Sequence, residues 1–248
     1  MDPKQLLTLS FQAAIAAADP LKILPSHLPH PPSGRTLVIG AGKAAASMAV
    51  AVEQHWPRDA ALEGLVVTRY KHGLPTRRIR VIEAGHPVPD ETGESAAKEI
   101  LRQVRSLAPN DLLLALISGG GSALLSLPVE AVGMDALKAT TRELLRSGAP
   151  IQDINTVRKH LSAIQGGRLA AASKAPVLAL IISDVTGDDP THIASGPCAP
   201  DPTTYRDALE VLHRYGVDAA PEVRQHLERG ARGEISETPK PGDGSFER

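Results

Sequence analysis

The sequence predicts an α/β protein in which a doubly wound, mostly parallel sheet is flanked by helices, as in Rossmann-like folds. Short apolar runs recur along the chain, with the length and composition of strands that are buried on both faces. Segments with helical spacing separate these runs, and several runs end directly in glycine-rich or polar loops. Because ligands of such sheets bind beyond the carboxyl ends of the strands, the residues that follow each run are the candidate site residues.

The individual elements follow from periodicity and from helix start and stop signals. Buried strands are expected at 35–39, 64–68, 78–83, 112–117 and 175–183. Helices are expected at 3–18, from the turn at 40–45 to about 56 with Lys43 in the first turn, from a cap at Asp90 or Thr92 to about 107, at 134–146, and from 153 to the break at 166. Two shorter helices are expected between 205 and 230. The first helix carries an apolar stripe, and we expect it to pack on the outside of the sheet. We interpret 1–235 as one Rossmann-like domain and the proline-rich 236–248 as a linker or the start of a further domain.

Composition excludes several classes of protein. The 248 residues carry a formal net charge of -1 and only 2% aromatic residues, so neither a basic stripe nor stacking side chains favour nucleic-acid binding. A single cysteine, Cys198, excludes an internal disulfide and fits a reducing compartment. Neither a signal peptide nor an apolar run of membrane-spanning length is found. We expect a cytoplasmic protein without membrane contact, and a homodimer is one assembly left open.

The most informative stretch is Ser118–Ser122, the glycine loop of LISGGGSALL. An apolar strand breaks at Ser118 into Gly119, Gly120 and Gly121, and Ser122 then begins a helical pattern. Residues without Cβ let a ligand approach main-chain N–H groups, and a helix N-terminus behind them favours negative charge. The loop therefore predicts an anion site, although an empty glycine-rich turn is the alternative.

A second glycine-rich turn follows the first strand. Gly40, Gly42 and Ala45 match the dinucleotide fingerprint, but the acidic residue that should end the second strand is replaced by Arg69. This argues against NAD and leaves NADP open. Lys43 is more informative, because a cation in the first helical turn interacts unfavourably with the helix dipole, and a bound anion would offset that cost.

Other polar residues lie at the ends of predicted elements. His86 follows the third strand, where it either binds an anionic substrate or holds its loop. A later helix carries three polar residues on the side away from its apolar face: Asn155, Arg158 and Lys159. Either these side chains contact a phosphate or carboxylate, or they form a basic face exposed to solvent.

Three carboxylates follow the last predicted strand. Asp184, Asp188 and Asp189 lie within six residues and would repel one another without compensation by water or a cation. Carboxylate oxygens suit Mg²⁺, which is held by one or two carboxylates together with substrate phosphates. A lysine, a nest of N–H groups and clustered carboxylates at one edge are the parts that phosphoryl transfer needs.

These motifs resemble those of the glycerate 2-kinases that carry a C-terminal MOFRL domain. The resemblance rests on VIGAGKAA, AGHPVPDETG, LISGGGSALL, INTVRKHLSAIQGGRLA and SDVTGDDPTHIASGPCAPDPTTY, in the same order. It implies phosphorylation of D-glycerate to 2-phosphoglycerate with ATP and Mg²⁺, so that glycerate and a nucleotide are the small-molecule partners. Family members continue into a second domain, and the active site is expected between the two domains. We therefore expect weak or no turnover from these 248 residues, with anion binding retained.

The resemblance also implies roles for individual residues. Lys43 becomes the active-site lysine, and Asp184 and Asp189 become catalytic candidates, with Asp188 joining them as a metal ligand. The implied substrate and phosphate contacts are Gly42, His86, Ser118, Gly119, Gly120, Gly121, Ser122, Asn155, Arg158 and Lys159. Two other functions stay open at this point: an NADP-dependent hydroxypyruvate reductase and a non-catalytic domain that binds small anions.

Overall fold

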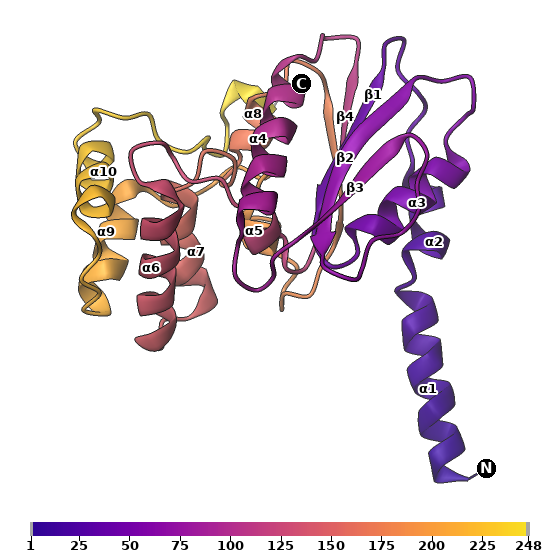
Figure 1. Ribbon diagram of the computed structural model, residues 1–248, viewed down its shortest axis with the longest axis horizontal. Coiled ribbons are helices and arrows are strands. Elements are labelled where there is room, and N and C mark those ends of the chain that lie inside the picture. The colour runs from indigo at the N-terminus through magenta and orange to yellow at the C-terminus, as the bar shows by residue number, and fades with distance from the viewer. Residues whose placement is uncertain (1, 247–248) are drawn as a thin grey trace.

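A computed structural model describes residues 2–246, so Met1 and the last two residues of the predicted 236–248 segment lie outside the described part (Figure 1). The expected α/β architecture is confirmed. Five parallel strands form one sheet in the order β3-β2-β1-β4-β5. Their bounds are Thr36–Ala41 for β1, Leu62–Arg69 for β2, Ile79–Ala84 for β3, Leu112–Ser118 for β4 and Val177–Ile182 for β5.

Helices cover both faces of the sheet, which is why the central strands are apolar along their whole length. On one face, alternate residues of β1 and β4 pack with α3 (Ala45–His55), α2 (Pro20–Ile23) and η1 (Leu24–His27). On the other face they pack with α4 (Glu91–Arg105), α5 (Gly121–Leu124) and α8 (Arg168–Ala171). The edge strand β5 is only partly buried, which corrects the expectation of a fully buried fifth strand.

The strand order determines where a ligand can enter. The chain winds outward from β1 through β2 to β3 and then returns to the other side of β1 with β4. In such sheets the crevice lies at this change of direction, beyond the carboxyl ends of the two strands. The two glycine-rich turns follow β1 and β4, so they flank the crevice together.

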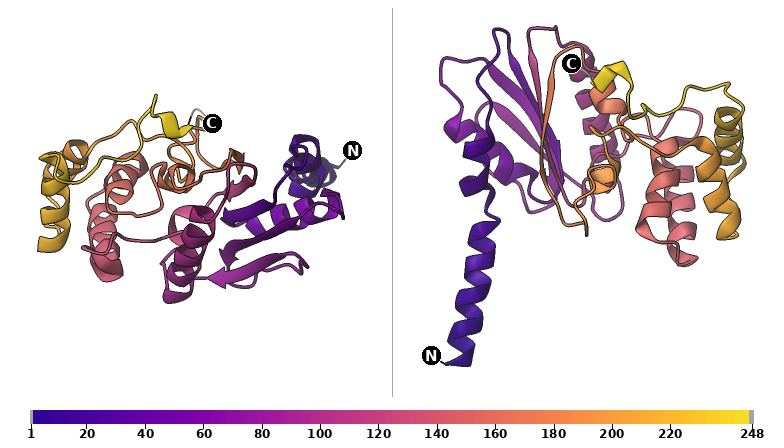
Figure 2. Two further views of the ribbon diagram at one scale, coloured as in Figure 1. Left: turned by 90° about the horizontal axis from the view of Figure 1, so that it is seen from above. Right: turned by 180° about the vertical axis from the view of Figure 1, so that it is seen from behind.

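Four helices form a separate layer beside the sheet (Figures 1 and 2). These are α6 (Gly133–Arg146), α7 (Ile151–His160), α9 (Tyr205–Arg214) and α10 (Pro221–Ala231), which bury a core of their own around Leu144, Val157, Tyr205 and Leu227. The short 3₁₀ helix η2 (Ile193–Ser195) contacts both α7 and α5. The sequence predicts these helices but not the second core that they share.

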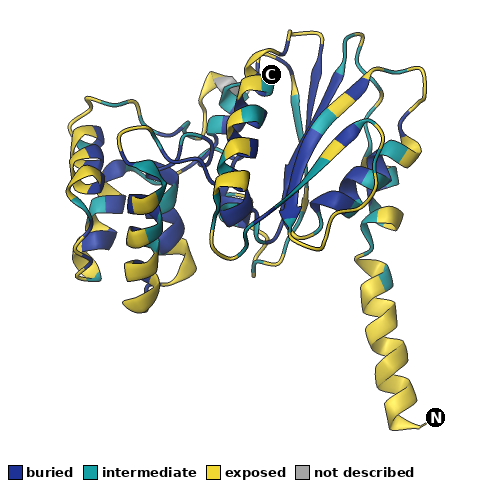
Figure 3. Cartoon of the chain, viewed as in Figure 1, coloured by how far each residue is buried: buried dark blue, intermediate teal, exposed yellow. Residues whose placement is uncertain are grey.

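The N-terminal helix α1 (Pro3–Ala17) does not pack on the sheet as expected. It projects away from the body, and none of its residues is buried (Figure 3). The face that it was expected to cover is occupied by α2, η1 and α3. Within residues 2–246, no single helix has the length and apolar character to cross a membrane, although α1 and the bent segment Pro20–His27 pass that test as a pair.

The segment after α10 lies against the body. Glu237 accepts a hydrogen bond from the backbone N–H of Tyr205 at 2.9 Å, and Thr238 is buried. The backbone N–H of Asp201 donates to the carbonyl of Pro239 at 2.8 Å. A last short 3₁₀ helix, η3 (Gly244–Phe246), contacts α8. The described part of the predicted linker is thus held by specific contacts.

Candidate active site

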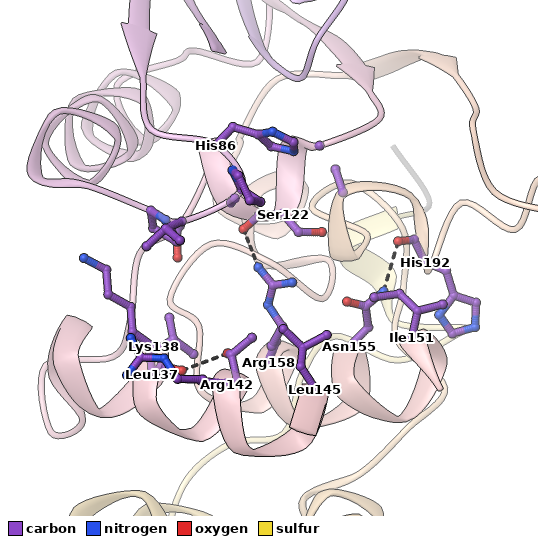
Figure 4. A pocket seen from close by; sticks show the side chains of 18 of the residues that line it. His86, Ser122, Leu137, Lys138, Arg142, Leu145, Ile151, Asn155, Arg158 and His192 are labelled. Atoms are coloured by element: carbon purple, nitrogen blue, oxygen red, sulfur yellow. Dashed lines mark hydrogen bonds between the residues drawn. The ribbon is translucent and has the colours of Figure 1, made fainter. Parts of the chain in front are cut away.

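A pocket of about 410 Å³ lies between the carboxyl edge of the sheet and the helical layer (Figure 4). The loops after β3, β4 and β5 form one side, and α6 and α7 form the other. The residues that line it include His86, Gly120, Ser122, Lys138, Arg142, Asn155, Arg158, Asp184 and His192. Several of the residues predicted from sequence therefore meet in one cavity.

The glycine loop allows other side chains to approach its backbone. A Cβ on Gly119 would overlap the carboxylate of Asp184, and a Cβ on Gly120 would lie 2.8 Å from Nε2 of His86. Gly120 also has a φ of +86°, a conformation that is strained for residues with side chains. The helix behind the loop, α5, has only four residues, so the expected N-terminal anion site is reduced to one turn. The glycines are required for close packing of the site.

The turn after β1 is joined to this loop. Gly42 has a φ of +139°, and a Cβ there would overlap the hydroxyl of Ser118. That hydroxyl accepts a hydrogen bond from the backbone N–H of Ala44 at 3.0 Å, while Lys43 N–H donates to the carbonyl of Gly119 at 2.9 Å. Gly42 and Ser118 thus fix the two loops against each other, and Ser118 itself is buried.

Lys43 and Asp184 form an ion pair at the edge of the sheet. The Nζ of Lys43 lies 2.9 Å from Oδ2 of Asp184, and their side chains are 45% and 51% exposed. Lys43 precedes α3, which begins at Ala45, rather than lying in its first turn. Because both groups remain open to solvent, each is accessible to a ligand.

Arg158 reaches from α7 toward the glycine loop. Its guanidinium donates to the carbonyl of Ser122 at 2.9 Å, as Figure 4 shows. Within the described residues it has no carboxylate within ion-pairing distance, and burial lowers its pKa to about 10. It therefore stays protonated at neutral pH. A cation enclosed without a counter-ion is a binding group for an anion.

A chain of side-chain hydrogen bonds closes the wall beside Arg158. The hydroxyls of Ser122 and Ser195 lie 2.9 Å apart, and Ser195 donates to Oδ1 of Asn155 at 3.1 Å. Ser195 and its neighbour Ala194 have φ values of +59° and +52°, a strained conformation for such residues. Asn155 also donates to the carbonyl of His192 at 3.3 Å. Asn155 thus both lines the pocket and orients its wall.

Two histidines in the pocket are uncharged at neutral pH. Burial, helped by the charges of Lys43 and Arg69, lowers the pKa of His86. Burial, helped by Lys159, likewise lowers the pKa of His192. A neutral imidazole can accept a proton from a hydroxyl group.

The three aspartates do not converge as expected. Asp184 lines the central pocket, whereas Asp188 lies at a separate hollow beside β5. Asp189 caps the following turn by accepting from the N–H of Thr191 at 2.8 Å; burial alone would raise its pKa, but this bond and His192 hold the pKa low. The backbone turns through left-handed residues at Gly187 and Asp188, which separates the carboxylates. In the described part of the chain, no three His, Cys, Asp or Glu residues lie close enough to hold a metal ion.

Lys159 also differs from expectation, because it does not line the pocket. Its side chain is fully buried, and Nζ lies 3.2 Å from Oδ1 of Asp201, which is fully buried as well. Asp201 further accepts from the backbone N–H of Thr203 at 3.0 Å. A buried charge requires a partner, and this pair connects α7 to the loop before α9. Lys159 therefore belongs to the structural core of the helical layer.

A family profile described as "Domain of unknown function (DUF4147)" matches residues 6–228. The chain belongs to the DUF4147 family. Its relatives include a "Putative hydroxypyruvate reductase" of Agrobacterium vitis, which is 51% identical over 97% of this chain and 54% of its own length. A glycerate 2-kinase of Pyrococcus horikoshii is 50% identical over 84% of this chain and 47% of its own length.

Solved structures agree with the fold of this DUF4147 chain. A crystal structure of a Pyrococcus horikoshii protein superposes with a TM-score of 0.87 at 43% identity, over 97% of this chain and 58% of the other. A glycerate kinase structure from Thermotoga maritima gives a TM-score of 0.83 at 40% identity, over 96% of this chain and 57% of the other. The chain thus spans about half the length of the relatives that it matches.

Sequence reasoning missed several residues of the DUF4147 pocket. Lys138 and Arg142 line it from α6, and His192 and Ser195 enclose its wall. The spacing of Lys138 and Arg142, four residues apart on one helix, places them on the same side and was the available signal. Ser195 gave no such signal, since its position depends on left-handed backbone that its residue type does not favour.

Proposed function

We propose that this DUF4147 chain provides the substrate-binding half of an enzyme that phosphorylates D-glycerate to 2-phosphoglycerate with ATP. Relatives named glycerate 2-kinase, at 50% and 41% identity, support the reaction. The observation that carries the proposal is the pocket in which Arg158, which has no carboxylate partner among residues 2–246, faces the glycine loop and the accessible Lys43–Asp184 pair.

The roles follow from charge and position. Arg158 binds the carboxylate of glycerate, with Asn155 and Ser122 beside it. Lys43 neutralises negative charge on the transferred phosphoryl group. This role matters because enzymes catalyse phosphoryl transfer mostly by positioning and electrostatic stabilisation. Either His86 or Asp184 accepts the proton of the attacking hydroxyl, because both line the pocket and an imidazole or a carboxylate can act as a general base.

Mg²⁺ fits this site through one carboxylate. Asp184 is half exposed in the pocket, and a magnesium ion held by one carboxylate, phosphate oxygens and water needs no preformed cluster. When bound, the ion would offset negative charge on the phosphate oxygens. Asp188 and Asp189 are not required for this arrangement, and we propose Asp184 as the protein ligand.

Arg158 provides the test of the carboxylate site. We expect Arg158→Met to weaken D-glycerate binding about tenfold to a hundredfold, because a hydrogen bond to a charged group contributes about 1.5–3 kcal/mol. Titration calorimetry of the chain with D-glycerate measures this change. The matched control is Arg102→Met, which alters an exposed arginine of α4 outside the pocket. Equal affinity of the two variants would show that Arg158 does not hold the substrate.

The reductase alternative finds less support in the geometry. A Cβ on Gly40 would lie 2.5 Å from the carbonyl of Leu116, and Gly42 packs on Ser118, so contacts between β1 and β4 account for these glycines without a dinucleotide. Arg69, the residue proposed for the extra phosphate of NADP, does not line the central pocket.

A further inference from the structure

The central pocket has two unlike ends, one polar and one apolar. His86 and Ser122 lie at the polar end. We define the mouth wall as Val88, Leu137, Leu145 and Ile151, which line the same pocket from the loop after β3, from α6 and from the start of α7. Figure 4 shows Leu137 and Leu145 on the helix opposite His86 and Ser122, with Arg158 between the two sides.

Glycerate does not account for the mouth wall. Val88, Leu145 and Ile151 are 59%, 61% and 49% exposed, so large aliphatic side chains face solvent at the entrance. A three-carbon hydroxy acid has no apolar face with which to cover them, and it fills only part of about 410 Å³. Cavities of about 300–1,000 Å³ with apolar walls and a few polar groups typically hold larger ligands. The unused wall therefore fits a second ligand with flat, apolar faces.

Two cations stand next to this wall. Lys138 and Arg142 lie four residues apart on α6, on one side of the helix, and both line the pocket. Within residues 2–246, neither forms a hydrogen bond or an ion pair. Lys138 interacts electrostatically with Asp90, whose carboxylate already accepts from the N–H groups of Gly85 and Gly93. Like charges at this spacing repel, so an anion between them is favoured.

We propose that the mouth wall and the Lys138–Arg142 pair form the nucleoside side of a nucleoside triphosphate site. The purine base lies against the aliphatic side chains of the mouth wall, and Lys138 and Arg142 face the ribose and the phosphates. The remaining phosphates extend toward Lys43 and the glycine loop. This inference rests on the proposed kinase function. It places the phosphoryl donor, the nucleoside triphosphate, and the phosphoryl acceptor, glycerate, at opposite ends of one cavity.

Thr141 allows a direct test, because it lines the pocket between the two cations. We expect Thr141→Trp to weaken ATP binding at least about tenfold and to abolish adenosine binding, since the indole occupies the place of the base. Binding of inorganic tripolyphosphate should change less than about twofold. Glu143→Trp is the control, since it adds the same side chain to the exposed face of α6. Calorimetric titration with ATP, adenosine and tripolyphosphate gives all three affinities.

A second set of variants distinguishes loss of the binding site from misfolding of Thr141→Trp. Leu145→Ser alters an exposed side chain and should weaken adenosine and ATP but not tripolyphosphate. Lys138→Ala combined with Arg142→Ala should weaken ATP and tripolyphosphate together. Unchanged ATP affinity in Thr141→Trp and Leu145→Ser would overturn the nucleoside site and indicate that another protein segment covers the wall. Failure of the unaltered chain to bind tripolyphosphate would instead count against the kinase function itself.

Discussion

Lys43→Ala is expected to lower kcat for D-glycerate phosphorylation about a thousandfold, which corresponds to about 4 kcal/mol of transition-state stabilisation. The lysine lies at the carboxyl edge of the sheet, 2.9 Å from Asp184 and next to the glycine loop. Charge on the transferred phosphoryl group develops in this region if the proposed function holds. Removing the ammonium group therefore removes this electrostatic stabilisation.

The loss should not reflect unfolding. Because both partners of the pair are about half exposed, the ion pair contributes only about 0–1 kcal/mol to stability. Lys98→Ala is the matched control, since the exposed Lys98 forms an ion pair with Glu94 on α4, away from the pocket. Steady-state kinetics should be measured on whichever form turns over, either these 248 residues or a chain extended by the second domain that the sequence resemblance implies. A Lys43→Ala protein that is folded and retains full kcat would rule out the role assigned to Lys43.

Lys159→Met is expected to destabilise the fold by about 3–5 kcal/mol, because it leaves the carboxylate of Asp201 buried without its counter-ion. The neighbouring His160 links this pair to its surroundings, since its Nε2 lies 3.9 Å from Asp201 and 3.3 Å from Glu237, and its ring packs against Tyr205. Replacing both partners, as in Lys159→Met with Asp201→Leu, should recover most of the loss, since neither charge of this pair is then left buried without the other. Urea denaturation followed by circular dichroism measures each free energy of unfolding.

An exposed ion pair provides the comparison. Arg224→Met removes the surface partner of Asp218 and should change the free energy of unfolding by less than about 1 kcal/mol. If Lys159→Met were as mild as Arg224→Met, the buried pair would not have the structural role that we assign to it.

Local pattern was sufficient to predict the sheet. The strands β1 and β4 are apolar throughout because helices cover both of their faces, and this appears directly as runs such as Leu112–Ile117. Parallel strands place their carboxyl ends at one edge, so the residues after each run predicted the region of the pocket. Lys43, His86 and Asp184 do lie at that edge.

The sequence-based predictions were wrong where the surroundings of a side chain depend on segments that are distant in the sequence. Helical spacing placed Arg158 and Lys159 away from the apolar face of α7, but it could not show that Asp201 covers Lys159 while Arg158 faces the pocket. Spacing along the chain likewise grouped three aspartates that a left-handed turn then separates. The apolar stripe of α1 predicted packing, yet other helices occupy the expected face of the sheet.

The most direct test of the proposed function is phosphorus NMR of the product formed from ATP, D-glycerate and Mg²⁺. It should be run on the 248-residue chain and on the chain extended as above. We predict a new phosphomonoester signal split into a doublet, since a phosphate on C2 couples to a single methine proton; the extended form should give the stronger signal. Absence of any new phosphomonoester from both forms, with NADPH oxidised in the presence of hydroxypyruvate, would contradict the kinase and favour the reductase.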